Sequence, residues 1–178
     1  MKSVWSPTLA WFFAILAAVL FAVAAPTESS VMGRLPNLQA RQLDQQPLAL
    51  PEGLDADRTL ALISFHRDQR PAVDSWIDGL QLGGDASVRW LRMLVVNDPG
   101  DAAERGMIEN RLRERYAQEK ATVVPVFTDR AAFARSTGLS GVEQPHVVVL
   151  NRRGEVLARV EGPFDAEKAR ALRATLGE

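Results

Sequence analysis

The chain has 178 residues, of which 24% are charged, and a formal net charge of −1, which is typical of one folded domain with accessory segments. This charge does not indicate a nucleic-acid partner, because nucleic-acid-binding proteins usually carry a strongly basic surface. A net charge near zero is still compatible with a local basic patch. Cysteine is absent, which excludes disulfides, thiolate nucleophiles, zinc–thiolate sites, covalent haem attachment and a lipoprotein anchor.

Residues 1–25 have the features of a targeting segment. Lys2 precedes an uncharged apolar run over residues 9–25, which ends in the small-x-small pattern of Ala22, Val23 and Ala24. The length of this run lies where cleaved signal peptides and spanning helices overlap, so both a signal peptide and a retained membrane anchor stay open. Either one predicts an exported protein whose remaining chain is periplasmic or otherwise extracytoplasmic.

Residues 26–51 are rich in Gln, Pro and short polar side chains, which predicts a linker and an irregular lead-in. The domain is expected over residues 52–178. It begins with a short apolar run at residues 59–65, typical of a buried strand. Pro71 then opens a helix with an apolar stripe at i, i+3, i+4 and i+7, formed by Val73, Trp76, Ile77 and Leu80.

The rest of the domain alternates between apolar runs and polar helices. Strands are predicted over residues 88–96, 122–127, 146–150 and 155–161, and helices over residues 101–118, after Asp129 and after Asp165. The arginines of the 101–118 helix are expected to be solvated. The order β-α-β-α-β-α-β-β-α implies parallel crossovers, closed by an antiparallel hairpin and a helix.

The stretch VFTDRAAFARSTGLSGVEQPHVVVLNRRGEVLARVEGPFD carries a family resemblance. A short helix ends in a glycine, Gln144-Pro145 precedes an apolar strand, a glycine turn follows, and the next strand ends at Gly162-Pro163. This combination resembles the thioredoxin-like superfamily, above all exported, membrane-tethered thiol–disulfide oxidoreductases that serve cytochrome c maturation, and peroxiredoxin-like proteins. The resemblance covers residues 60–176. It implies a thioredoxin-like α/β fold, with a central mixed sheet flanked by helices and Pro145 as the family's cis-proline.

The sequence departs from that family at its catalytic motif. The family places Cys-x-x-Cys at the start of the first helix, where the helix N-terminus lowers a thiol pKa. When strand and helix are aligned without gaps, Arg70 and Val73 stand at these two positions. Neither side chain can exchange disulfides. A weaker resemblance, in the stretch from Ser64 to Trp76, is to thioredoxin-like assembly factors of the mitochondrial ATP synthase.

The resemblance also implies a candidate binding crevice, because the first helix N-terminus and the X-Pro loop lie side by side in this family. The residues expected there are His66, Arg67, Arg70, Gln144, Pro145 and His146. A helix N-terminus with arginines favours a peptide carboxylate or a phosphate, and the backbone edge at Gln144 would pair with a peptide strand. Alternatively, His66 and Arg67 only solvate a loop while His146 is a satisfied strand residue, or the two histidines bind a metal.

These observations predict a redox-inactive binding or assembly factor of the cell envelope that holds a protein or peptide partner. Two alternatives stay open. One is a cysteine-free enzyme or small-anion-binding protein that uses the crevice, and the other is a structural subunit of an envelope complex. No Ser-His-acid set, carboxylate pair or glycine-rich phosphate motif favours an enzyme. No cofactor, metal or nucleic acid is expected.

Overall fold

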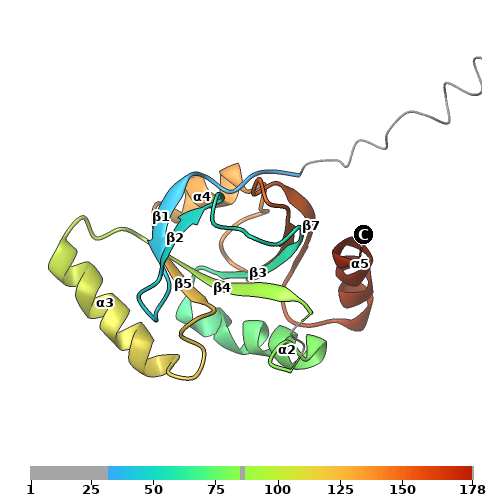
Figure 1. The fold of residues 1–178 in the computed structure, drawn as a ribbon, viewed down its shortest axis with the longest axis horizontal. Helices are drawn as coiled ribbons and strands as arrows, with labels where there is room; N and C mark the ends of the chain where they lie inside the picture. The colour runs from blue at the N-terminus through green and yellow to red at the C-terminus, as the bar shows by residue number, and fades with distance from the viewer. Residues whose placement is uncertain (1–31, 85–86, 178) are drawn as a thin grey trace, which may run out of the picture. The chain divides into compact units, whose positions relative to one another are not determined.

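A mixed five-stranded sheet lies at the centre of the computed structural model, which describes residues 32–84 and 87–177 (Figure 1). The strand order is β5-β4-β3-β6-β7. Strand β3 pairs in parallel with β4, and β4 with β5, whereas β6 is antiparallel to both β3 and β7. The strands are β3 (Thr59–Ser64), β4 (Arg89–Val96), β5 (Val123–Phe127), β6 (His146–Leu150) and β7 (Val156–Glu161).

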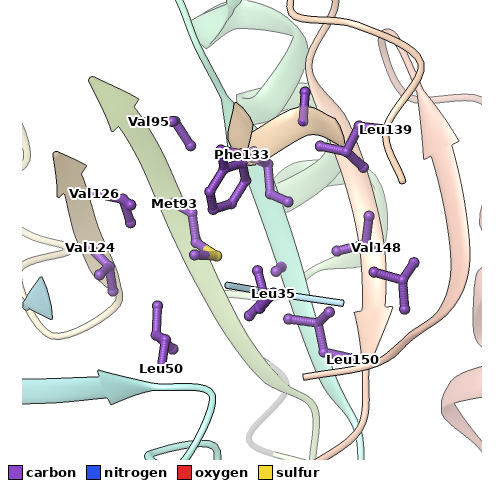
Figure 2. Close-up of a cluster of buried hydrophobic side chains, with 14 of the residues drawn as sticks. Leu35, Leu50, Met93, Val95, Val124, Val126, Phe133, Leu139, Val148 and Leu150 are labelled. Carbon is purple, nitrogen blue, oxygen red and sulfur yellow. The ribbon is translucent and has the colours of Figure 1, made fainter. Parts of the chain in front are cut away.

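Helices cover both faces of this sheet, because alternate side chains of each strand point to opposite sides. On one face, Leu60 and Leu62 of β3 pack with the apolar stripe of α2 (Arg70–Leu80) and with α5 (Ala166–Leu176). On the other face, α4 (Arg130–Ser136) contributes Phe133 to a core that includes Met93, Val148 and Leu150 (Figure 2). The predicted order of elements from residue 59 onward is confirmed.

Helix α3 (Ala102–Arg115) differs from the others because it contributes no fully buried residue. It begins at Asp101, whose side chain accepts a hydrogen bond from the backbone N–H of Glu104, as an N-cap does. It ends just before Tyr116, which is buried with Leu94 and Val123. The C-terminal end of the helix thus lies beside the start of α2, where Arg70 lies over the ring of Tyr116.

The segment before β3 is ordered, unlike the predicted linker and irregular lead-in. Strands β1 (Leu38–Arg41) and β2 (Pro47–Leu50) form an antiparallel hairpin, and Leu50 is fully buried. Upstream of the hairpin, the backbone of residues 32–35 bonds to Val156 and Gly154. Residues 32–51 therefore belong to the same compact unit as the sheet.

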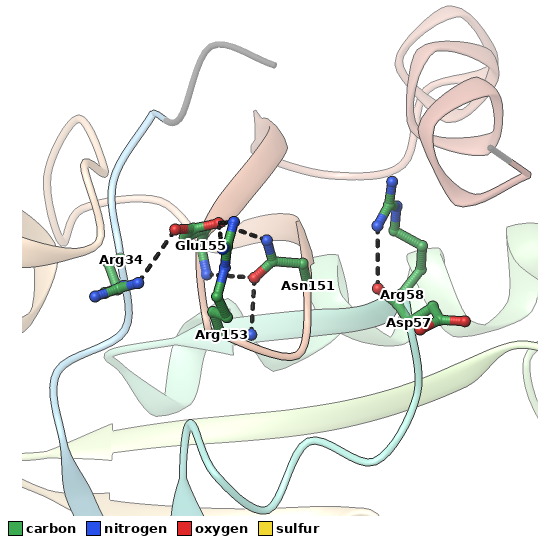
Figure 3. A network of polar contacts seen from close by, with 6 residues as sticks. All are labelled: Arg34, Asp57, Arg58, Asn151, Arg153 and Glu155. Carbon is green, nitrogen blue, oxygen red and sulfur yellow. Dashed lines mark hydrogen bonds and ion pairs between the residues drawn. The ribbon is translucent and has the colours of Figure 1, made fainter. Parts of the chain in front are cut away.

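A polar network reinforces this attachment at the turn between β6 and β7 (Figure 3). Arg34 contacts Glu155 at 3.1 Å, and Asn151 and Arg153 donate hydrogen bonds to the same carboxylate. The hydrogen bond from Asn151, followed by those from Arg153, lowers the pKa of Glu155.

Residues 1–25, predicted to be a signal peptide or anchor, lie outside the described residues. Between residues 32 and 177, leaving aside 85–86, no helix has both the length and the apolar character that a membrane crossing requires.

Candidate functional site

The loop between β3 and α2 is organised by the buried side chain of Gln69. The loop contains a short 3-10 turn, Arg67–Gln69, and α2 follows directly with Pro71 in its first turn. The side-chain oxygen of Gln69 accepts hydrogen bonds from the backbone N–H groups of Phe65 and His66, at 2.8 and 3.3 Å. Its amide nitrogen donates to the carbonyl of Val142 at 2.8 Å. Gln69 thus ties the start of α2 to the loop before β6.

Arg70 occupies the position where the resemblance places the first cysteine, and its guanidinium is engaged within the protein. The Nε atom lies 3.3 Å from an oxygen of Asp74, one turn later on α2. The guanidinium also lies over the ring of Tyr116, 5.0 Å from its centroid, at a distance typical of a cation–π contact. Val73, at the second cysteine position, is buried in the core.

A second arginine reaches the same cluster from the sheet. Arg92 lies within β4 and is almost completely buried, and its guanidinium is also 5.0 Å from the centroid of Tyr116. Its Nη2 atom donates to Asp74 at 2.6 Å and lies 3.2 Å from Glu119. Asp74 therefore contacts both arginines, whereas Glu119 contacts Arg92.

An open cavity of about 170 Å³ lies beside this cluster, at the ends of β3 and β4, where α2 begins and α3 ends. Its apolar lining comes from Phe65, Leu94, Val95, Val96, Leu112 and Tyr116. Its basic lining consists of His66, Arg67, Arg70, Arg115 and Arg130. No carboxylate lines the cavity, although the whole chain is slightly acidic.

The structure divides the six residues predicted for the crevice. His66, Arg67 and Arg70 line the cavity, whereas Gln144, Pro145 and His146 do not. Gln144 is exposed, and Pro145 is buried and accepts a hydrogen bond from the backbone N–H of Gly162. The two loops still lie side by side, but they meet through Gln69 and Val142.

His146 is a satisfied core residue, which was the alternative interpretation of its sequence position. It is only 2% exposed, its Nε2 atom is 3.0 Å from the carbonyl oxygen of Gly141, and its ring packs edge-on against Phe65. Burial lowers its pKa, against smaller opposing effects of the Gly141 carbonyl and Glu161. Among the described residues, no group of three or more histidine or acidic side chains is placed to bind a metal ion.

The prediction of a cis bond before Pro145 is wrong. Within residues 32–84 and 87–177, the cis peptide bond is Leu50–Pro51. The loop before this proline bends at residues 142–144, and hydrogen bonds from His146 to Gly141 and from Gln69 to Val142 fix it. The bond before Pro145 is trans, the intrinsically favoured form of an X-Pro bond.

Several site residues were missed at the sequence level. Arg92 interrupts an apolar strand, and a charge within a buried strand signals a partner, since buried charges are almost always paired. Arg115 is exposed, as expected for an arginine of this helix, and it also lines the cavity because α3 ends there. Nothing in the local sequence distinguishes Gln69, Asp74 or Arg130 from ordinary polar residues, because their roles depend on distant elements.

Comparison with known proteins identifies the fold. No protein-family model matches the sequence, and no curated protein matches it. Among solved structures, a protein of Aquifex aeolicus VF5 described as a candidate electron transport protein has 17% identity and a TM-score of 0.58, covering 84% of this chain and all of that one. BsSco, a member of the Sco family of cytochrome c oxidase assembly proteins, has 12% identity and a TM-score of 0.54, covering 80% of this chain and 91% of that one.

A SCO1/SenC family lipoprotein of Bacillus anthracis str. Ames is also similar, with 12% identity and a TM-score of 0.53, covering 83% of this chain and 97% of that one. At such identities these likenesses establish the fold alone. The chain therefore has a thioredoxin-like fold, and it carries that fold without cysteine.

Proposed function

We propose that this protein is a redox-inactive thioredoxin-like binding or assembly factor of the cell envelope, which holds a protein or peptide partner. The observation that carries the proposal is the arrangement at position 70. The position aligned with the nucleophilic cysteine is taken by an arginine bound to Asp74 and stacked on Tyr116. A guanidinium group does not deprotonate in proteins, and in its protonated form it is not a nucleophile that can attack a disulfide.

The surroundings of position 70 support a binding role. The cavity there is open, and the exposed Gln144 lies in the loop that Gln69 connects to the start of α2. The site therefore offers a hollow with apolar and basic lining beside an accessible loop, as a peptide site needs. One structural neighbour is named as an assembly protein and another as a lipoprotein, which favours an assembly role and an extracytoplasmic location for this chain.

Site-specific photo-crosslinking tests the proposal. A photoreactive amino acid is placed at Gln144, and as a matched control at Arg152, which is exposed at the opposite end of β6. We expect full-length protein in its native envelope to give a discrete protein adduct from position 144 and none from position 152. Equal adducts from both positions, or no adduct from position 144, would contradict binding at this face.

A further inference from the structure

The basic lining of the cavity is unusual because two of its four guanidinium groups have no partner among the described residues and a third uses only one of its nitrogens. Over the described part of the chain, the side chains of Arg67 and Arg115 make neither a hydrogen bond nor an ion pair. Arg130 uses its Nε atom to bond the carbonyl oxygen of Val95 at 3.1 Å, which leaves its two terminal nitrogens facing no described acceptor. Three arginines at one hollow thus offer unused donors.

The remaining arginine of the cavity is only partly neutralised. Arg70 shares Asp74 with Arg92, whose contact with that carboxylate is the shorter one, 2.6 Å against 3.3 Å. Glu119 contacts Arg92 and does not line the cavity. The lining of the hollow therefore carries a net positive charge that no lining carboxylate offsets.

Like charges gathered without counter-charges lower the stability of the free protein, and a bound anion would remove that repulsion. Guanidinium groups recognise carboxylates through paired N–H donors in a planar fork. The cavity volume of about 170 Å³ is below the range of about 300–1,000 Å³ typical of drug-sized ligands. It therefore suits one acidic group and a few attached carbon atoms rather than a nucleotide-sized ligand.

We infer that this cavity binds a carboxylate of an acidic peptide segment, with Arg67, Arg115 and Arg130 as donors and Arg70 as a further positive charge in the lining. The inference rests on the proposed function and names the chemistry of its partner. The apolar walls formed by Phe65, Leu94 and Leu112 would accept an aliphatic residue next to the acidic one. The carboxylate can belong to an acidic side chain or to the C-terminus of the partner, and both present the same two oxygens.

Peptide titration followed by NMR of the full-length chain tests the inference and separates these two sources. The probes are acetyl-Leu-Glu-Leu-amide, acetyl-Leu-Gln-Leu with a free C-terminal carboxylate, and the uncharged acetyl-Leu-Gln-Leu-amide. We expect saturable shifts in the amide signals of residues 65–70, 94–96 and 112–116 with at least one charged peptide. Binding of the uncharged peptide should be at least about fivefold weaker, as expected for losing a charge-assisted contact.

Variants assign the effect to the cavity. Arg67→Ala combined with Arg115→Ala should weaken binding of the charged peptide by roughly tenfold, whereas Arg152→Ala, which removes an arginine at the other end of β6, should leave it unchanged. Neither arginine of the double variant has a protein partner among the described residues, so its melting temperature should match that of the parent.

Three results would overturn the inference: no saturable shift at the cavity with either charged peptide, equal affinity for the uncharged peptide, or unchanged affinity in the double variant. Shifts caused by inorganic phosphate alone would overturn the assignment to a peptide carboxylate. Photo-crosslinking from position 144 separates this failure from a failure of the proposed function. Adducts that form with equal yield in the parent and in the double variant would support the binding function and contradict the carboxylate inference.

Discussion

Arg92 shows how a charged side chain can occupy a position in a core strand. Its guanidinium is only 1% exposed, and its Nε and Nη1 atoms have no hydrogen-bond partner. The contact with Glu119 at 3.2 Å is close enough for an ion pair but lacks the alignment of a hydrogen bond. The short hydrogen bond to Asp74 and the ring of Tyr116 are therefore the principal compensation for taking this cation out of water.

This dependence makes Asp74 a residue whose charge matters for stability. We expect Asp74→Asn to lower the free energy of unfolding by about 1–3 kcal/mol, because it leaves the buried guanidinium with only the poorly aligned contact to Glu119, while the half-exposed position of Asp74 limits the loss. Urea denaturation measures the change. Asp78→Asn, at an exposed position four residues further along α2, is the matched control and should change stability by less than about 0.5 kcal/mol. Equal losses in both variants would contradict this account of Arg92.

At the scale of elements, the hairpin β1–β2 shows what the sequence could not reveal. Its strands have only four residues each, and Gln45 adopts a positive φ in the connection, where a glycine or asparagine would have signalled a turn. The alternation of Leu48 and Leu50 is too short to distinguish a strand from a lead-in. By contrast, α2 was predictable because Pro71 and the four apolar positions after it mark both its beginning and its buried face.

The lack of a clear apolar–polar alternation also explains why the orientation of the His146 side chain could not be predicted from the sequence. Side chains alternate along β6, and His146 is paired with Ile63 of β3, so it points into the core that holds Val148 and Leu150. The sequence HVVVL is apolar throughout apart from its histidine, and it contains no alternation from which the direction of that side chain follows. The lining of the cavity likewise depended on where α3 ends, and helix ends are the least determined feature of a sequence.

The close crossing of the N-terminal segment and the end of α4 gives a test at this scale. Gly138 has a φ of +67°, and a Cβ atom added there would lie 2.0 Å from the carbonyl oxygen of Met32. We expect Gly138→Ala to lower the free energy of unfolding by at least about 2 kcal/mol, because both the backbone conformation and the contact would be strained. Thermal or urea denaturation of the purified protein measures it.

Gly106→Ala provides the matched control for this prediction. Gly106 lies within α3, and an added Cβ would meet nothing within 4 Å. This change should raise stability by about 0.5–1 kcal/mol, since alanine is the better helix former. A tolerated alanine at position 138 would show that the segment around Met32 does not pack on the domain in solution as it does here.

At the scale of the whole molecule, the fold places the start of α2 at the ends of the parallel strands β3 and β4, where α/β proteins commonly build their sites. The predicted order of strands and helices was sufficient to infer this location. The chemistry at the location then depends on two side chains, Arg70 and Val73, that the same backbone presents. The absence of thiol chemistry is therefore a property of these residues and of the missing sulfur, and not of the backbone arrangement.

The backbone at the start of α2 can be tested separately from the side chains that it presents. Positions 70 and 73 are three residues apart in the first turn of α2, and residues at i and i+3 on a helix lie on the same side at a separation compatible with a disulfide. A thiol at position 70 would also face the helix N-terminus, which lowers its pKa and favours the thiolate.

We expect the parent protein to show no insulin-disulfide reductase activity. We expect Arg70→Cys combined with Val73→Cys to form an intramolecular disulfide and to show activity above a buffer blank. Arg70→Cys alone is the control, because a single thiol forms mixed disulfides without completing a turnover. Mass spectrometry with and without reductant detects the bond, and an insulin turbidity assay measures the rate. If the double variant folds but forms no disulfide, the backbone at the start of α2 does not hold positions 70 and 73 in a geometry that allows a disulfide, and the alignment of Arg70 with a nucleophile is incorrect.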